Sequence, residues 1–348
     1  VPPETVFAVF STVVHALHAG DHLQAFRAVN DELLVAMDGT QYFASNKIHC
    51  AQCSITKHAN GTVTYSHHVI TPVIVAPHNR HVLPLEPEFI APQDGHDKQD
   101  CENAAAKRWL ARFGARYRSL GVTILGDDLY CKQPLCEAIR AQGLNFILVC
   151  KPDSHPTLSE WVAGLAATED VHTLSVERRH GKRIETDTYR FVNQVPLRDG
   201  EDALLVNWCE LTTTRSDGKV LYHNAFATNH PITAANVAEI VLAGRSRWKV
   251  ENENNNTLKT KGYHLTHNFG HGKQHLSALL ASLNLLAFLF HTLLDLLDSS
   301  YQRIRRFLPR KTFFDDLRAL TRYLCFQNWQ ALMAFMTEGL ELHPPDTS

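Results

Sequence analysis

The chain has 348 residues, of which 44% are hydrophobic and 20% charged, and its formal net charge at pH 7 is -2. This composition fits a soluble globular enzyme that buries a full core, in one large domain or two ordinary ones. A nearly neutral chain has no bulk attraction for nucleic acid, so any such contact must come from local clusters of basic residues.

Cysteine usage predicts a reducing compartment. The chain has eight cysteines, and only Cys50 and Cys53 show a tight, regular spacing. We therefore expect no disulfide framework. Since no secretory signal opens the chain, we expect a cytoplasmic protein.

Two apolar, strand-like runs end in an acid. Asp38 follows Glu-Leu-Leu-Val-Ala-Met, and Asp127 follows Gly-Val-Thr-Ile-Leu-Gly. A short aliphatic or β-branched run of this kind places the acid at the edge of a sheet, where loops build sites. Asp38-Gly39 alone would also fit a simple turn. Together the two runs predict carboxylates that converge.

The pair Cys50-Ala-Gln-Cys53 fits half of a zinc site in a hairpin between two early strands. Two thiolates and one or two imidazoles satisfy tetrahedral zinc. Nearby imidazoles come from His49, His58, His67 and His68. No second Cys-x-x-Cys exists, and the alternative is a pair of ordinary thiols near a turn.

A helix is predicted from Cys101 to about Leu120, with Asp100 as its N-cap. Beyond it, residues 171–178, 183–192 and 203–214 show partial alternation and many β-branched residues, separated by turn signals, which predicts a β-rich insertion. A basic cluster lies at its first turn and is either a phosphate-binding segment or a solvated hairpin tip. Its members are Arg178, Arg179, Lys182 and Arg183.

Four polar residues, Arg247, Glu251, Asn255 and Lys259, lie four positions apart on a predicted helix. Side chains at this spacing share one helix face, so a carboxylate is flanked by two cations. Such a face suits a site in which an acid holds a metal ion and basic groups hold phosphate oxygens.

The apolar stretch 276–294 is nearly long enough to span a bilayer, but it contains Asn284 and His291 and is soon followed by Asp295 and Asp298. We expect a buried helix that packs beside the helix of Glu251, and no membrane span. The segment 301–322 mixes basic and aromatic residues, which indicates either contact with a nucleic-acid backbone or a charged helix surface.

Three blocks resemble the DDE transposases of bacterial insertion sequences. They are Met-Asp-Gly-Thr-Gln-Tyr-Phe (37–43), Leu-Gly-Asp-Asp-Leu-Tyr (125–130) and the segment 247–272, which opens with Arg-Trp-Lys-Val-Glu and closes with Gly-Tyr-His-Leu-Thr-His-Asn-Phe-Gly-His-Gly. The resemblance runs from about residue 30 to about residue 295. Each block is weak alone, and their order with a long spacer makes the set fairly specific.

The resemblance implies an α/β, ribonuclease-H-like fold: a mixed sheet flanked by helices, with an inserted β-rich subdomain and a helical C-terminal region. The expected divisions are 1–150 for the first part of the catalytic core, 151–235 for the insertion, 236–298 for the rest of the core and 299–348 for the C-terminal helices. Because the chain opens at Val1 and not at methionine, a truncated product without an amino-terminal end-binding domain is also consistent with it.

The resemblance also implies catalysis with two Mg²⁺ or Mn²⁺ ions. Asp38 would bridge them, while Asp127 and Glu251 would each complete one metal. Arg247, Lys259 and the basic cluster would bind DNA phosphates. Glu102 or Asp97 near the metals is a weaker expectation. Expected partners are double-stranded DNA and a second copy of the chain, in a bacterial cytoplasm at the nucleoid.

Two choices rest on geometry and family pattern together. Asp127 is preferred to its neighbour Asp128 because Tyr130 follows it by three residues, as in the family's acid-x-x-aromatic pattern. Glu251 and Glu253 point about 200° apart on a helix, so both cannot face the site. Glu251 is preferred because it aligns with Arg247 and matches the family's Arg-Trp-x-aliphatic-Glu pattern. The chain departs from the common pattern where Gly244 replaces a tyrosine and where Lys259 falls one residue late.

Two other functions remain open at this point. One is a catalytically inactive DNA-binding or regulatory protein derived from a mobile element, and the other is a ribonuclease-H-like nuclease. Fold alone does not choose among them. Metal-dependent DNA cleavage would separate the first from a transposase, and the β-rich insertion favours a transposase over a compact nuclease.

Overall fold

The computed structural model describes residues 1–92, 101–180, 183–268 and 270–342. One large mixed sheet runs through the molecule, with strand order β7-β6-β2-β9-β10-β14-β13-β12-β11. In that order the strands are Asn79–Pro84, Val73–Ala76, Glu32–Ala36, Val122–Gly126, Asn145–Val149, Val220–Thr228, Leu205–Arg215, Arg183–Pro196 and His172–His180, and the short β1, Arg27–Ala28, pairs with β2.

The centre of this sheet is parallel. β2 pairs in parallel with β9, and β9 with β10, whereas β6 pairs with β2 in antiparallel fashion. The runs Leu33–Ala36 and Val122–Gly126 are buried along their whole length, as expected for strands covered on both faces. A large mixed sheet flanked by helices confirms the predicted ribonuclease-H-like fold class.

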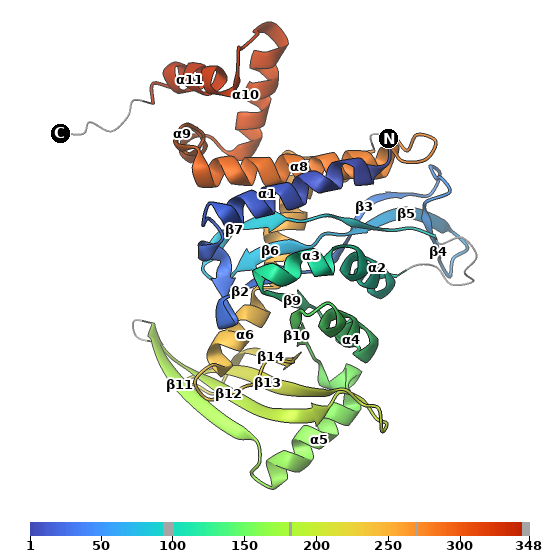
Figure 1. The fold of residues 1–348 in the computed structure, drawn as a ribbon, viewed down its shortest axis with the longest axis vertical. Helices are drawn as coiled ribbons and strands as arrows, with labels where there is room; N and C mark the ends of the chain where they lie inside the picture. The colour runs from blue at the N-terminus through green and yellow to red at the C-terminus, as the bar shows by residue number, and fades with distance from the viewer. Residues whose placement is uncertain (93–100, 181–182, 269, 343–348) are drawn as a thin grey trace, which may run out of the picture.

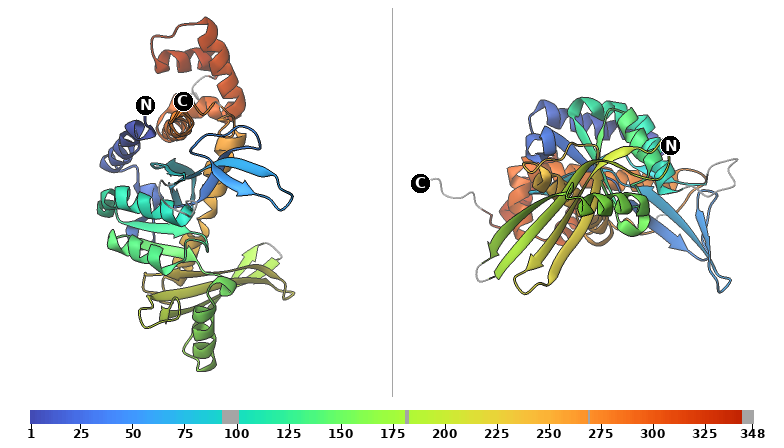
Figure 2. Two further views of the ribbon diagram at one scale, coloured as in Figure 1. Left: turned by 90° about the vertical axis from the view of Figure 1, so that its right-hand side faces the viewer. Right: turned by 90° about the horizontal axis from the view of Figure 1, so that it is seen from below.

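Helices cover both faces of the sheet (Figures 1 and 2). α2 and α4 lie on one face, and α6, α7 and the π-helical segment Val250–Asn255 lie on the other. The helices are α1 Phe7–Ala19, α2 Glu102–Trp109, α3 Ala115–Tyr117, α4 Gln133–Ala141, α5 Pro156–Ala167, α6 Val237–Arg245, α7 Asn256–Thr260, α8 Leu276–Leu297, α9 Ser299–Phe307, α10 Arg310–Tyr323 and α11 Trp329–Gly339. The helix expected from Cys101 to Leu120 is thus present, with a π-helical stretch at Leu110–Gly114, while its expected N-cap, Asp100, lies outside the described residues.

The β-rich insertion extends the core sheet. β14 pairs with β10 in antiparallel register, Ile147 opposite Thr228, so the four strands β11–β14 continue the sheet past β10. Three of these strands match the predicted segments, and β14 follows the predicted turn at Ser216–Lys219. The insertion also contains α5, a helix that the sequence did not predict and that packs on β12.

The chain leaves the large sheet at Asp38. β2 ends at Ala36, and β3, Gly39–Ser45, belongs to a second, four-stranded sheet with β4, Ser54–Lys57, β5, Val63–Ile70, and β8, Glu88–Ile90. The backbone N–H of Thr71, at the return crossing from β5 to β6, donates to the carbonyl of Asp38 at 3.1 Å. Asp38 is therefore held where two sheets meet.

α6 approaches β14 and β10 closely at Gly244. A Cβ at this position would lie 2.7 Å from the ring of Phe226 and 3.0 Å from the side chain of Ile147. Such spacing leaves no room for a side chain without a shift of the helix. The glycine that departs from the family pattern thus fits the packing of the helix that leads into Arg247.

α8 is the one helix in the described residues that is long and apolar enough to cross a membrane by length and composition. It packs against β7, α1 and α9, with Leu285, Phe288 and Leu289 buried. Its side chain Asn284 donates to the carbonyl of Tyr263, and His291 bonds the Tyr263 hydroxyl at 2.8 Å. Asn284 and His291 therefore attach one face of α8 to the segment after α7, so the helix is buried on that side as expected, while Leu283 and Phe290 are exposed.

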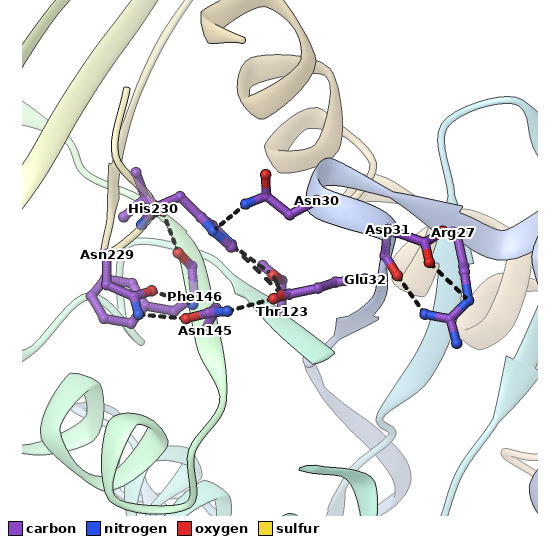
Figure 3. Close-up of polar contacts among 10 residues, drawn as sticks. Arg27, Asn30, Asp31, Glu32, Thr123, Asn145, Phe146, Asn229 and His230 are labelled. Atoms are coloured by element: carbon purple, nitrogen blue, oxygen red, sulfur yellow. Dashed lines mark hydrogen bonds and ion pairs between the residues drawn. The ribbon is translucent and has the colours of Figure 1, made fainter. Parts of the chain in front are cut away.

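A polar network joins the amino ends of β2, β9 and β10 (Figure 3). Thr123 donates to Glu32 at 2.5 Å, and Asn145 donates to the other Glu32 oxygen at 2.6 Å. His230 lies between Thr123, at 2.8 Å, and Asn30, at 3.0 Å. These bonds fix the strands at the end opposite to Asp38 and Asp127, so the carboxyl ends are left for a site.

Candidate active site

Asp38 and Asp127 come together because their strands are adjacent and parallel. β2 ends just before Asp38 and β9 ends just before Asp127, and Ala36 lies opposite Leu125 in the register. The carboxyl ends of neighbouring parallel strands share one edge of the sheet. The charge of Asp127 raises the pKa of Asp38, as expected for two carboxylates at one edge.

Among the carboxylates of this site, Asp38 has the pKa that is shifted most from its ordinary value. Burial raises its pKa from 3.8 to about 7, with further contributions from the charges of Glu251, Glu102 and Asp127, and Arg247 opposes the rise. Its Oδ2 accepts a hydrogen bond from the Asn255 amide at 3.3 Å. A half-buried carboxylate faced by three others is a strong candidate for a metal ligand, because a cation would relieve both burial and repulsion.

Asp127 and its neighbour Asp128 face different surroundings. Oδ1 of Asp127 accepts from the backbone N–H of Leu129 at 2.9 Å. Asp128 accepts from the backbone N–H of Lys151 at 2.7 Å and lies 3.5 Å from Nε2 of His155, so it is turned toward the end of β10. This difference favours Asp127 as the member of the acidic cluster.

Glu251 stands on the π-helical segment Val250–Asn255, and π-helical turns occur frequently at functional sites. Its Oε1 accepts from Arg247 at 2.7 Å, and its carboxylate raises the pKa of Asp38. Glu253 lines a different pocket with Arg80, His81 and Asp295. The two glutamates thus face different sides of the helix, as their spacing predicts.

Asn255 and Lys259 complete the predicted helix stripe. Oδ1 of Asn255 accepts from the Thr71 hydroxyl at 2.7 Å, which aims its amide at Asp38. Burial lowers the pKa of the Lys259 ammonium, while the charge of Asp38 acts in the opposite direction. Arg247 and Lys259 therefore supply positive charge on both sides of the acids.

Glu102 adds a fourth carboxylate, which the sequence indicated only weakly. It opens α2, accepts from the Tyr130 hydroxyl at 3.2 Å and from the backbone N–H of Gly39, and raises the pKa of Asp38. Burial raises the pKa of Glu102 as well. Only the fold brings Tyr130, three residues after Asp127, into contact with Glu102. Asp97, the other weak expectation, lies outside the described residues.

The basic cluster of the β11–β12 hairpin is only partly available for phosphates. Arg178 forms an ion pair with the buried Asp187 at 2.5 Å, so it has a structural partner. Arg179 is exposed on β11. Lys182 lies outside the described residues, and of Arg183 the structure describes only its backbone at the start of β12.

The cysteine pair lies in the connection between β3 and β4 of the second sheet. Both thiols are free, with sulfur atoms 3.8 Å apart. Of the histidines named from the sequence, His67 approaches both sulfurs. His49 instead stacks on Tyr65, and His58 bonds Thr64.

The acidic cluster is suited to hard divalent cations. Its donors are carboxylate oxygens from four separate elements, together with an amide that orients one of them, and Mg²⁺ and Mn²⁺ prefer oxygen ligands. The flanking Arg247 and Lys259 suit phosphate oxygens. The arrangement can therefore hold a metal ion against a phosphodiester.

Comparison with known families gives an independent result. A family described as "Transposase DDE domain" matches residues 61–289. Asp127 and Glu251 fall within the matched segment, and Asp38 precedes it. The search of curated proteins found no match.

Proposed function

Because the chain belongs to the transposase DDE domain family, we propose that it cleaves and joins DNA strands at the ends of a mobile element with the help of divalent metal ions. One observation carries this proposal. Asp38 and Asp127 follow two neighbouring parallel strands at one edge of the sheet, and Glu251 lies on the π-helical segment. The charges of Glu251 and Asp127 both raise the pKa of Asp38.

The metal ligands in this proposal are Asp38, Asp127 and Glu251. Two Mg²⁺ or Mn²⁺ ions held by these carboxylates would activate the attacking oxygen and neutralise charge at the leaving oxygen. Glu251 would leave its ion pair with Arg247 to bind metal, since its side chain is half exposed. Glu102 would raise the negative charge that attracts the ions.

Other side chains orient these acids and hold DNA. Asn255, fixed by Thr71, orients Asp38. Arg247, once released from Glu251, and Lys259 would bind phosphate oxygens beside the metals, and Arg179 would add a contact from the insertion. Each such cation neutralises one phosphate, so binding should weaken as salt rises.

The partners we propose are double-stranded DNA and a second copy of the chain. α8 exposes an apolar line at seven-residue spacing, which suits contact with another helix. Its members are Leu276, Leu283, Phe290 and Leu297. A mass measurement by light scattering, with and without end DNA, tests this: a dimer that forms on DNA supports it, and a strict monomer on DNA contradicts it.

The activity test uses a duplex that carries the DNA flanking the coding region, in the presence of Mg²⁺. Asp38→Ala, Asp127→Ala and Glu251→Gln should each reduce cleavage at least about a hundredfold, because each removes a metal ligand. Asp128→Asn and Glu253→Gln are the matched controls, since these neighbouring acids face elsewhere.

Equal cleavage by the wild type and all three ligand variants would refute the proposal. A wild type that binds the duplex but never cuts it with Mg²⁺ or Mn²⁺ would favour an inactive DNA-binding protein. Cleavage without joining, on any duplex, would favour a nuclease.

A further inference from the structure

Two segments far apart in the sequence meet at a group of four metal-binding side chains. His67 lies on β5 of the second sheet, Cys50 and Cys53 lie in the loop between β3 and β4, and His271 comes from the loop that connects α7 to α8. One ligand atom from each residue lies within 4.8 Å of the other three. None of these residues belongs to the acidic cluster.

The separations among Cys50, Cys53 and His67 are close to those of a tetrahedral zinc site. The two sulfurs are 3.8 Å apart, and Nε2 of His67 is 3.3 Å from the Cys50 sulfur and 3.2 Å from the Cys53 sulfur. Tetrahedral zinc, with bonds of about 2.3 Å to sulfur and 2.0 to 2.1 Å to nitrogen, requires ligand separations of roughly 3.3 to 3.8 Å.

The surroundings orient the ligands as metal sites do. The second ring nitrogen of His67, Nδ1, lies 3.3 Å from the Tyr42 hydroxyl, which leaves Nε2 facing the thiols. The backbone N–H of Cys50 points to the Cys53 sulfur at 3.4 Å. Thiolate ligands are commonly supported in this way by donors of the backbone.

His271 gives a second, independent indication. Both of its ring nitrogens are buried, and neither has a hydrogen-bond partner. Buried polar atoms are nearly always satisfied, so an unpartnered imidazole needs an explanation. The ring of His271 packs edge-on against the ring of Phe43, with 4.2 Å between the ring centroids. Its centroid lies 4.7 Å from the ring centroid of His67. A metal ion would satisfy one of its nitrogens.

We propose that Cys50, Cys53, His67 and His271 bind one structural zinc ion. Two thiolates and two imidazoles form a closed set with no open position, which distinguishes a structural from a catalytic zinc. The ion would fasten the loop after α7 to the second sheet. Because α7 continues directly from the segment that bears Glu251, and Asp38 borders the second sheet, zinc would fix two parts of the acidic site relative to each other.

The first test measures the zinc content of full-length protein purified without chelator, in buffer with excess Mg²⁺. The wild type should hold one zinc per chain. Cys50→Ser, Cys53→Ser, His67→Asn and His271→Asn should each lose most of it. Cys325→Ser and His49→Asn, at an exposed cysteine and at a histidine that stacks on Tyr65, should keep it.

Zinc retained by all four ligand variants would overturn the proposal, and so would a wild type that contains no zinc and binds none on titration. Asp38→Ala separates this site from the proposed catalytic one: it should retain zinc whether or not it cleaves DNA. Loss of zinc in Asp38→Ala would assign the ion to the acidic cluster and also overturn the proposal.

A second measurement does not depend on the folding of variants. Cobalt(II) is titrated into zinc-depleted wild-type protein. A Cys₂His₂ site predicts thiolate-to-cobalt charge-transfer absorption together with the visible bands of tetrahedral cobalt, both abolished by one equivalent of zinc. Cobalt bound without thiolate absorption would contradict the assignment. Zinc should also slow tryptic cleavage after Lys273, in the attached loop, and an unchanged rate would contradict its fastening role.

Discussion

At the scale of the single residue, Asp38 combines burial with the charges of three other carboxylates, and its pKa rises from 3.8 to about 7 as a result. The folded protein without metal therefore favours protonated Asp38, and its stability falls as pH rises from about 4 to about 7. The site is stabilised by whatever cation it binds.

Asp38→Asn should consequently stabilise the metal-free protein at pH 8 while it removes activity. The pKa shift corresponds to about 4 kcal/mol, and we expect a gain in unfolding free energy of roughly 2 to 4 kcal/mol. Urea unfolding in buffer free of Mg²⁺ and Mn²⁺ measures it. The gain should vanish near pH 4, and a variant less stable than wild type at pH 8 would contradict this account.

The affinity for Mg²⁺ should also depend on the protonation of Asp38, but it should rise with pH. Mg²⁺ requires the deprotonated carboxylate, so its apparent affinity should rise steeply up to about pH 7 and level off above. Calorimetric titration with Mg²⁺ between pH 5.5 and 8.5 tests this. Affinity independent of pH over that range would show that Asp38 is not a ligand.

Gly39 provides room for Glu102. A Cβ at position 39 would lie 2.3 Å from the Glu102 carboxyl carbon, so Gly39→Ala should displace that carboxylate and lower Mg²⁺ affinity severalfold. Gly164→Ala is the matched control, because its Cβ would meet nothing within 4 Å on α5. The control should be neutral or stabilise the protein by about 0.5 to 1 kcal/mol. Equal Mg²⁺ affinity in both variants would refute the contact.

At the scale of the element, the partly buried His291 joins α8 to Tyr263 through a hydrogen bond. Burial lowers the pKa of His291 from 6.5 to about 4, and the charges of Arg310 and Arg305 act in the same direction. In the unfolded chain this histidine takes up a proton below pH 6.5, whereas in the folded protein it stays neutral until about pH 4.

The contribution of neutral His291 to the unfolding free energy should therefore be fully present above pH 6.5. As the pH falls from 6.5 to 4, this histidine should lower the unfolding free energy by about 3 kcal/mol. His291→Gln should show a smaller loss over that range, while His15→Gln, at an exposed position on α1, should follow wild type. Denaturant unfolding at several pH values measures the difference. A wild type and a His291→Gln protein with parallel pH curves would contradict the assignment.

Gly244, on α6, allows a test of the close packing just before the segment that bears Glu251. Gly244→Ala introduces a Cβ 2.7 Å from the Phe226 ring, so it should destabilise the protein by roughly 1 to 3 kcal/mol despite the better helix propensity of alanine. Thermal unfolding, with Gly164→Ala as the comparison, measures it. A Gly244→Ala protein as stable as Gly164→Ala would show that the packing is loose.

The local sequence pattern was enough to predict a strand where consecutive residues are all buried. Residues Leu33–Ala36 and Val122–Gly126, before Asp38 and Asp127, predict strands because all of them except Thr123 are apolar or small, and the structure buries these residues fully. The helix residues Arg247, Glu251, Asn255 and Lys259 all interact with Asp38, although a π-helical segment lies between the first and the last of them. The π-helix itself, and α5 within the insertion, were not predictable from apolar periodicity alone.

At the scale of the whole molecule, long-range pairing limits what a sequence can reveal. The antiparallel contact of β14 with β10 joins the insertion to the core sheet, and no local pattern encodes which edges will meet. His271 approaches Cys50 for the same reason: only the fold brings the loop before α8 onto the second sheet. Glu102 joins the acids through tertiary packing on Gly39 and Tyr130.

The central claim is that Asp38, Asp127 and Glu251 hold catalytic metal ions against DNA. A crystal of the protein with a short end duplex, soaked in Mn²⁺ and measured at the manganese absorption edge, tests it most directly. The account predicts anomalous peaks bonded to oxygens of these three carboxylates and to a DNA phosphate. Manganese bound at other residues in a complex that cleaves the duplex would contradict it.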